Sequence, residues 1–361
     1  SMTVGGISAT GTYYYRLSAT STGSGCTTPV YSASASLQVV ADPSAPTATK
    51  SPADAIVCAG QTLTLTGVTD NGGGTGTCNI QYSHNGGAYS TTLTPFAATV
   101  GTNTISIKKV CSGSGCDESG VTTYTWTVVA DPSLSAATRT NSVICAGGSS
   151  VFSSSLSNGT GTVGYQWQYS ADNTTWSNVV AGTPAGATYT NPTTTSMTIG
   201  GISATGTYYY RLSATSTGSG CTTPVYSASA TLQVVASPTV GTQPSTPATI
   251  CVGGTSANMT VAGSGGTGSF SYQWQYNNGG TWGNVSNGTP AGSTYTGGST
   301  ATFSVAGIST AGTYQYRCMI SQSGSGCATL SSNTVNVTVV ADPSLSAATR
   351  TNSVICAGGS S

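Results

Sequence analysis

VGYQWQYS, at residues 163–170, alternates aromatic with polar side chains and decides the fold around it. A period of two places Tyr165, Trp167 and Tyr169 on one face of a strand and the two glutamines between them on the other. Alternating runs of similar length surround this stretch, with Asn-Gly, Asp-Asn and Gly-Ser-Gly turn residues between them. These runs are VFSSSLS (151–157), MTIGGI (197–202), TYYYRLSA (207–214) and VYSASATLQVV (225–235). The pattern predicts β-strands and no helix.

Long internal repeats extend this pattern along the chain. Residues 1–40 recur at 196–235 with two changes, and residues 130–150 recur unchanged at 341–361. Such self-similarity is typical of repeat architectures. Recurring strand ends, VVADPS or VVASPT, predict the boundaries of an N-terminal tail (1–40, the C-terminal part of a repeat), a short repeat (41–129), a middle repeat (130–235), a third repeat (236–340) and a C-terminal segment (341–361, the N-terminal part of a further repeat). We expect the parent protein to extend in both directions.

A tryptophan strand followed later by a Gly-Thr-Tyr strand resembles the core of immunoglobulin-like sandwiches. The chain carries this order twice, as Trp167 with residues 206–208 and as Trp274 with residues 312–314. Repeats of about 100 residues suit the same fold. We therefore expect an all-β chain of tandem immunoglobulin-like β-sandwich domains in an elongated array.

Composition restricts the setting and the partners. Only 4% of the 361 residues are charged and the formal net charge is zero, so the chain lacks the basic field that nucleic acid requires. It also has no run of about 18 apolar residues, so we expect no membrane insertion. Eleven cysteines without CxxC pairs indicate disulfides rather than zinc. The expected localisation is extracellular, at the cell surface.

Cysteine spacing suggests one disulfide inside each repeat. One cysteine of each pair lies in an Ile-Cys or Val-Cys turn, and the other ends a Gly-Ser-Gly-Cys loop. The separation is the same in the middle and third repeats, which favours pairing within the repeat. The expected pairs are Cys58 with Cys116, Cys145 with Cys221, and Cys251 with Cys327.

The other cysteines need separate interpretations. Cys78 and Cys111 occur only in the short repeat and are expected to bond to each other, replacing aromatic packing in a smaller core. Cys26 and Cys356 would pair with residues beyond the two ends of the sequence. Cys318 stands where Leu212 stands in the middle repeat, so a buried free thiol is favoured over a nucleophile.

The sequence contains no recognisable catalytic or metal site. Its one histidine, His84, lies in a Ser-His-Asn-Gly-Gly turn and is expected to be a solvated loop residue. Three aspartates, Asp42, Asp131 and Asp342, lie in Ala-Asp-Pro-Ser linkers. Bound calcium would need more carboxylates than these linkers supply, so a turn-forming Asp-Pro is favoured. We expect no enzyme activity, no cofactor and no metal.

The tryptophans allow a second function. Trp167 and Trp274 have aromatic neighbours two residues away and are expected in the core. Trp176 and Trp282 follow turns and are candidates for stacking on a sugar ligand. Four side chains of the Gly-Thr-Tyr strands are expected on a solvated face: Tyr209, Arg211, Gln315 and Arg317.

The ICAGG turn, the WQYS strand, the GTYYYR strand and the GSGC loop together resemble the repeats of very large surface adhesins that the type IX secretion system exports, including the gliding-motility adhesin SprB. The resemblance covers the whole chain. It implies a cell-surface adhesin or filament, and it offers no catalytic residues.

Two functions follow as hypotheses. In the first, the repeats form the stalk of an adhesin or an extracellular filament, with neighbouring repeats of the same chain, and other copies in a fibre, as partners. The near absence of charge leaves no repulsion between copies. In the alternative, the repeats bind surface polysaccharide as the accessory region of an extracellular enzyme.

Overall fold

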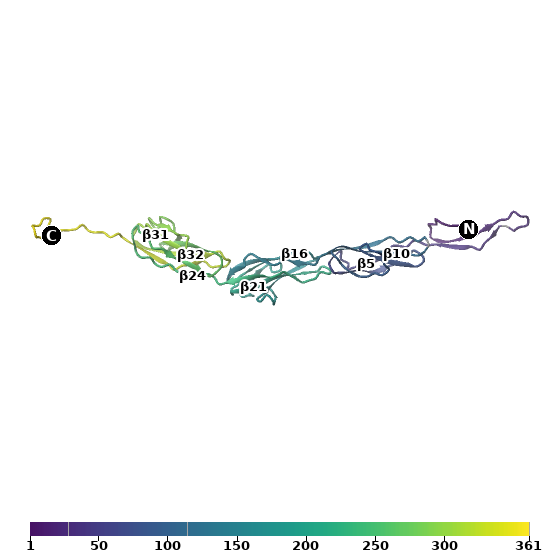
Figure 1. The fold of residues 1–361 in the computed structure, drawn as a ribbon, viewed down its shortest axis with the longest axis horizontal. Coiled ribbons are helices and arrows are strands. Elements are labelled where there is room, and N and C mark those ends of the chain that lie inside the picture. The colour runs from purple at the N-terminus through teal and green to yellow at the C-terminus, as the bar shows by residue number, and fades with distance from the viewer. Residues whose placement is uncertain (28, 114, 361) are drawn as a thin grey trace. The chain divides into compact units, whose positions relative to one another are not determined.

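The computed structural model describes residues 1–27, 29–113 and 115–360, and its regular elements are the strands β1 to β34 (Figure 1). The fold is all-β, with tandem immunoglobulin-like sandwiches, as the sequence predicts. In the described residues, no helix is long and apolar enough to cross a membrane. The chain forms two compact units: Ser1–Ser135 with Ser155–Tyr165 and Ser213–Ser227, and Ala136–Ser154 with Gln166–Leu212 and Ala228–Ser361.

The N-terminal tail forms two small antiparallel sheets. One pairs β1 with β4 and the other pairs β2 with β3. The four strands are β1 (Gly11–Tyr15), β2 (Ser18–Ala19), β3 (Val30–Tyr31) and β4 (Ala35–Val39). Several apolar residues of this tail are exposed, including Met2, Leu17 and Leu37.

The short repeat is a sandwich of two sheets. One sheet has the order β6-β11-β10-β8 and the other β5-β7-β9. Its strands are β5 (Thr47–Ser51), β6 (Ile56–Cys58), β7 (Thr62–Thr69), β8 (Cys78–His84), β9 (Phe96–Ala97), β10 (Gly101–Cys111) and β11 (Thr122–Val129). The cysteine-bearing strand β6 lies parallel to β11, with Cys58 opposite Val129.

The middle repeat has one larger sheet, β14-β23-β21-β17-β18 with β22 beside β21, facing the sheet β13-β15-β20-β19 and a small β12-β16 pair. Its strands are β12 (Ser133–Leu134), β13 (Thr138–Arg139), β14 (Val143–Cys145), β15 (Ser149–Ser153), β16 (Leu156–Ser157), β17 (Val163–Ser170), β18 (Ser177–Asn178), β19 (Thr188–Thr190), β20 (Ser196–Gly200), β21 (Gly206–Ser216), β22 (Val225–Tyr226) and β23 (Ala230–Val235). Here β14 lies parallel to β23 and Cys145 pairs with Val235.

The third repeat keeps the same plan. Its larger sheet has the order β25-β34-β32-β28-β29 with β33 beside β32, and the smaller sheets are β26-β31-β30 and β24-β27. Its strands are β24 (Thr239–Thr242), β25 (Ile250–Cys251), β26 (Met259–Thr260), β27 (Ala262–Ser264), β28 (Phe270–Asn278), β29 (Thr281–Asn284), β30 (Thr294–Thr296), β31 (Thr302–Ala306), β32 (Gly312–Gln322), β33 (Leu330–Ser331) and β34 (Val335–Val340). Cys251 lies opposite Val340 on a parallel pair.

Each core is built on a fully buried tryptophan. Trp167 and Trp274 have no exposed surface, as the sequence predicts, and each packs against a phenylalanine, Phe152 or Phe303. Their indole N–H groups donate to the carbonyls of Thr194 and Thr300 at 2.8 and 3.0 Å. Burial of the indole therefore leaves no unsatisfied donor.

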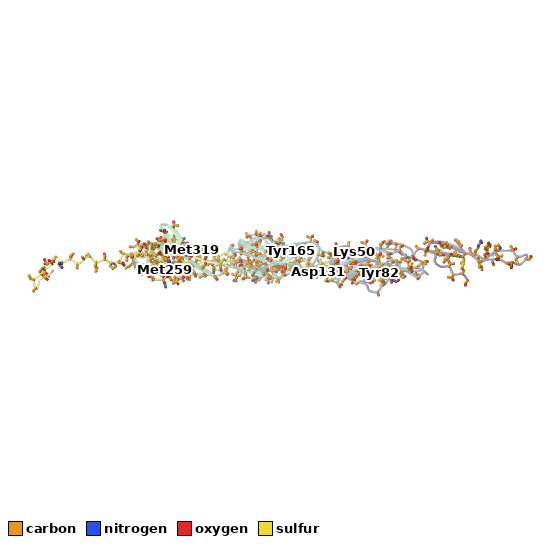
Figure 2. The ribbon with its side chains drawn as sticks, turned by 90° about the horizontal axis from the view of Figure 1, so that it is seen from above. Lys50, Tyr82, Asp131, Tyr165, Met259 and Met319 are labelled. Carbon is orange, nitrogen blue, oxygen red and sulfur yellow. A yellow bond between two sulfur atoms is a disulfide. The ribbon has the colours of Figure 1, made fainter. Side chains whose placement is uncertain are left out.

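Strand periodicity sorts the side chains of the third repeat between core and surface. Met259, labelled in Figure 2, is fully buried in the core with Trp274. On β32, Cys318 is buried whereas its neighbour Met319, also labelled in Figure 2, is half-buried. The alternation follows because successive residues of a strand point to opposite faces.

The short repeat takes its core tryptophan from a different strand. Trp126 of β11 is fully buried and donates to the carbonyl of Pro52 at 2.9 Å. Ile80, at the position of Trp167 in the middle repeat, is half-buried. Cys78 and Cys111 lie opposite each other on β8 and β10 and form a disulfide.

Candidate functional site at the junctions between repeats

The cysteine-bearing turn of each complete repeat is seated at the end of the last strand of that repeat. In the middle repeat the amide of Ala146 donates to the carbonyl of Val235 at 2.8 Å, and the amide of Gly147 donates to the carbonyl of Ile202 at 2.8 Å. Gly148 closes the turn by donating to the carbonyl of Cys145 at 2.9 Å. Gly147 has φ +84°, a left-handed conformation that favours glycine. These bonds fix the direction in which the Cys145 sulfur points.

The Cys145 turn is bonded to the loop of the next repeat. A disulfide joins Cys145 to Cys327, 182 residues further along the chain. The amide of Cys145 also donates to the carbonyl of Ser325 at 2.9 Å, and the amide of Ser149 donates to the Ser325 hydroxyl at 2.9 Å. A Cβ on Gly326 would overlap the backbone of Gly148. The two segments are therefore in close backbone contact around the covalent bond.

The junction between the short and middle repeats has the same construction. A disulfide joins Cys58 to Cys221, 163 residues apart, and the amide of Cys58 donates to the carbonyl of Ser219 at 2.8 Å. The Cα–Cα distances of the two junction disulfides are similar, 4.8 and 5.0 Å. Both turn cysteines, Cys58 and Cys145, are fully buried. The two junctions therefore share one construction, in which a buried turn cysteine is bonded to the loop cysteine of the following repeat.

This pairing corrects the expected disulfides. The pairs Cys58 with Cys116, Cys145 with Cys221, and Cys251 with Cys327 are wrong; the structure forms Cys58–Cys221 and Cys145–Cys327, and neither Cys116 nor Cys251 forms a disulfide in the described part of the chain.

The physical reason is the length of one strand. In the third repeat β32 begins at Gly312, opposite Val339 and beside the Cys251 turn, and ends at Gln322, shortly before Cys327. An eleven-residue strand spans on the order of 35 Å, far beyond the Cα separation that a disulfide allows. The turn and the loop of this repeat thus lie at opposite ends of its sandwich.

The remaining cysteines are unbonded in the described residues. Cys26, Cys251 and Cys356 are exposed, and Cys116 is half-buried. Cys318 is fully buried and forms no disulfide, as expected from its place in the core. Burial raises the pKa of the Cys318 thiol to about 11, so the thiolate is strongly disfavoured.

Trp176 and Trp282 each carry an arginine on one ring face. The guanidinium of Arg211 lies 4.3 Å from the Trp176 ring centroid, and that of Arg317 lies 4.4 Å from the Trp282 ring centroid. Both indoles are half-buried. The guanidinium thus occupies one of the two ring faces on which a sugar could stack.

Each of these arginines is held by the glutamines of the tryptophan strand. Arg211 Nε donates to Gln168 Oε1 at 2.9 Å and Arg317 Nε donates to Gln275 Oε1 at 3.0 Å. Gln168 and Gln275 in turn donate to asparagines of the neighbouring strand, at 3.3 and 3.2 Å. Arg211 and Arg317, expected on a solvated face, each contact a tryptophan ring and a glutamine side chain. The same set of contacts occurs in the middle and third repeats.

The residues considered as metal ligands are not gathered in one place in the described part of the chain. No group of three His, Cys, Asp or Glu side chains comes together in residues 1–27, 29–113 and 115–360. The carboxylate of Asp131, labelled in Figure 2, accepts hydrogen bonds from the amide and hydroxyl of Thr222 at 3.2 and 3.1 Å. His84 differs from expectation: it ends β8, is half-buried, and stacks on Phe96 with ring centroids 4.6 Å apart.

Comparison with known proteins gives matches of limited extent. Residues 135–236 match the model of a family described as a domain of unknown function, DUF8696. No curated protein is similar enough in sequence to count as a relative.

Solved structures give distant matches. The adhesin FdeC of Escherichia coli is 16% identical with a TM-score of 0.36, over 83% of this chain and 98% of that one. The N-terminal eight Ig domains of Down Syndrome Cell Adhesion Molecule are 14% identical with a TM-score of 0.35, over 92% and 40%. Immunoglobulin domains 1–5 of Sidekick-1 are 11% identical with a TM-score of 0.28, over 85% and 61%. The chain thus spans less than two thirds of the last two structures, and at these scores the likenesses carry no argument about function.

Proposed function

We propose that this chain is a force-transmitting repeat region of a long secreted cell-surface protein, as the stalk of an adhesin or as an extracellular filament. The observation that supports this most is the covalent bond at each junction, Cys58–Cys221 and Cys145–Cys327. A tether must transmit force from one domain to the next, and a disulfide across the junction does so without relying on a small noncovalent interface.

The two disulfide loops interleave along the sequence. Cys145 lies inside the loop closed by Cys58–Cys221, and Cys221 lies inside the loop closed by Cys145–Cys327. The shortest covalent route from Cys58 to Cys327 therefore crosses both disulfides and uses only the residues between Cys145 and Cys221. Its extended length is on the order of 250 Å, against about 900 Å for the reduced chain. The arrangement limits extension even when the sandwiches unfold.

The cellular setting and the role in adhesion belong to the same proposal. Disulfides at repeated positions favour an oxidising, extracellular environment. The resemblance of the motifs to type IX-secreted adhesins suggests a bacterial cell surface and a role in adhesion or gliding. We propose this non-catalytic role in preference to polysaccharide binding because arginines cover one face of both Trp176 and Trp282.

Single-molecule stretching of the whole chain tests the proposal. Reduction should lengthen the stretch between Cys58 and Cys327 by about 650 Å at full extension. In oxidised protein, the double substitution Cys145→Ser with Cys327→Ser should add only about 100 Å, because Cys58–Cys221 still shortens the route.

Disulfides inside the repeats give a different result. If Cys145 were bonded to Cys221, and Cys251 to Cys327, the same double substitution would release two whole loops, on the order of 500 Å. An added length of that size would reject the covalent junction and with it the proposed role.

A further inference from the structure

A cleft beside the edge strand β29 of the third repeat combines hydroxyl and amide side chains with one tyrosine. It has a volume of about 410 Å³ and is formed by the β28–β29 hairpin and the loop that follows β29. The polar residues that line it are Tyr276, Asn278, Thr281, Asn284, Ser286 and Thr289. Its volume lies in the range of sites that hold small molecules, about 300–1,000 Å³.

The strand side of the cleft is held in place by the sheet behind it. The ring of Tyr276 packs against Tyr314 and Tyr316 of β32, with ring centroids 6.2 and 5.5 Å apart. On β29, Asn284 Oδ1 accepts a hydrogen bond from Gln275 Nε2 at 3.2 Å, which orients the Asn284 amide. Side chains fixed in this way lose little conformational entropy when a ligand binds.

The loop side of the cleft is fixed through its backbone. Ser286 and Thr289 form an isolated β-bridge, in which the amide of Thr289 donates to the carbonyl of Ser286 at 3.1 Å. The hydroxyl of Tyr295 donates to the carbonyl of Thr289 at 2.7 Å. Because these bonds use backbone groups of Ser286 and Thr289, the hydroxyls of both residues remain available to a ligand.

Most polar side chains of the cleft have no partner within the described part of the chain. Four of them make no hydrogen bond to another described residue: Asn278, Thr281, Ser286 and Thr289. The same holds for the hydroxyl of Tyr276. Burial raises the pKa of Tyr276, so its hydroxyl stays protonated at neutral pH and is able to donate as well as accept.

The chemistry of the lining selects one class of ligand. Hydroxyl and amide groups donate and accept hydrogen bonds, as the hydroxyl groups of a sugar do. The described residues that line the cleft carry no charge, so an anionic ligand would lose hydration without gaining a cation. We propose that this cleft binds a neutral hexose unit of a glycan.

This site is separate from the two tryptophans that carry an arginine on one ring face. Thr281 and Gly283 line the cleft, whereas Trp282 between them contacts the guanidinium of Arg317. The inference goes beyond the proposed function, because transmitting force through the junctions needs no ligand.

The middle repeat lacks the groups on which the site depends. Val180 stands at the position of Ser286 and offers no hydrogen-bonding side chain. Ser177 stands at the position of Gly283, so a side chain enters the space that the glycine leaves open. The hairpin threonine of the middle repeat, Thr175, donates its hydroxyl to a carboxylate at 3.2 Å. We therefore assign sugar binding to the third repeat and not to the middle one.

Saturation-transfer NMR on the whole chain tests the proposal. The probes are the methyl glycosides of glucose, galactose and mannose, together with the corresponding uronates. We expect transfer to the ring protons of at least one neutral sugar. Its uronate should bind about tenfold or more weakly, because the cleft offers no cation to the carboxylate. Absence of transfer to all three neutral sugars, or equal binding of the uronate, would overturn the proposal.

Substitutions taken from the middle repeat locate the binding. The double substitution Gly283→Ser with Ser286→Val gives the cleft the side chains of the middle repeat, and nothing lies within 4 Å of the Cβ position of Gly283. The variant should therefore unfold in urea as the parent chain does, but bind the sugar about tenfold or more weakly. Trp282→Ala is the control and should leave binding unchanged. Binding that survives the double substitution, or that is lost with Trp282→Ala, would place the sugar outside this cleft.

Discussion

The amide of Cys145 donates to the carbonyl of Ser325 at 2.9 Å, two residues before the cysteine to which Cys145 is bonded. Cys58 and Ser219 have the same relationship, at 2.8 Å. A turn cysteine is thus held by one backbone hydrogen bond and one covalent bond to the same loop. Both bonds occur at both junctions. The turn and the Gly-Ser-Gly-Cys loop therefore determine together how the turn is oriented on the loop and that the two are covalently joined.

Disulfide mapping gives the most direct prediction. Digestion of oxidised, alkylated protein under nonreducing conditions should recover the Cys58 peptide linked to the Cys221 peptide, and the Cys145 peptide linked to the Cys327 peptide. The reason is the separation of turn and loop at opposite ends of each sandwich. Recovery of Cys145 linked to Cys221 would contradict the structure.

The same bonds should matter for stability. Closing loops of 163 and 182 residues is worth about 5 kcal/mol each in the chain-entropy model. The substitution of Cys145 and Cys327 together by serine should lower the free energy of unfolding by several kcal/mol in urea titrations. Cys251→Ser, at an exposed unbonded turn cysteine, is the matched control and should change it little.

The strands and the core could be predicted from the sequence because both depend on local alternation. YQWQY at residues 165–169 and 272–276 specifies a strand with one apolar face, and Trp167 and Trp274 are fully buried there. Trp126 was not predicted as a core residue. Trp126 lies on β11 and fills the core of the short repeat, where Ile80 stands at the position of Trp167. Which distant strands pack together cannot be predicted from the alternation within one strand.

The partners of the cysteines could not be predicted, for a geometric reason. Equal spacing in successive repeats fits pairing within a repeat and pairing to the next repeat equally well. Only the eleven-residue length of β32 and its register with β34 show that Cys251 and Cys327 lie at opposite ends. The sequence does predict the type of partner. Each junction disulfide joins one cysteine of a turn to one cysteine of a Gly-Ser-Gly-Cys loop.

Gly326 should be essential to the junction that contains Cys327. A Cβ at this position would overlap the Gly148 backbone, and the residue has φ +75°. We expect Gly326→Ala to slow formation of Cys145–Cys327 during oxidative refolding and to lower the free energy of unfolding by about 2 kcal/mol or more.

Gly115→Ala is the matched control for that change. Gly115 precedes Cys116 in the equivalent loop and has the same φ of +75°, but nothing lies within 4 Å of its Cβ position. It should show only the cost of the left-handed backbone, about 1 kcal/mol. Equal effects of the two substitutions would mean that the contact with Gly148 does not matter.

Two tyrosine pairs, each of one buried and one half-buried residue, should make the protein sensitive to alkaline pH. The hydroxyls of Tyr189 and Tyr210 lie 3.4 Å apart, and those of Tyr295 and Tyr316 lie 3.3 Å apart. Burial raises the pKa of Tyr189 to about 12 and raises the pKa of Tyr210 and Tyr316 well above the usual range. In the unfolded chain these groups ionise near pH 10, whereas burial keeps them protonated to higher pH in the folded protein.

The sign of the effect follows from proton binding. Above pH 10 the unfolded state binds fewer protons than the folded state, so stability is complete below pH 10 and falls as pH rises. Each buried tyrosine contributes a slope of about 1.4 kcal/mol per pH unit. Urea titrations from pH 9 to 12 should show this decline, and Tyr210→Phe should reduce the slope by one such step. An unchanged slope in that variant would contradict the assignment.

Cys318 should be the least reactive thiol of the chain. It has no exposed surface, and burial raises the pKa of its thiol to about 11, so neither access nor ionisation favours attack on a reagent. We expect an aromatic disulfide reagent at pH 8 to modify Cys251, which is exposed, at least 100-fold faster than Cys318. Urea should remove the difference, because unfolding exposes both thiols. Peptide mapping of the modified cysteines over time measures both rates, and labelling of the two at comparable rates in the folded protein would place Cys318 outside the core.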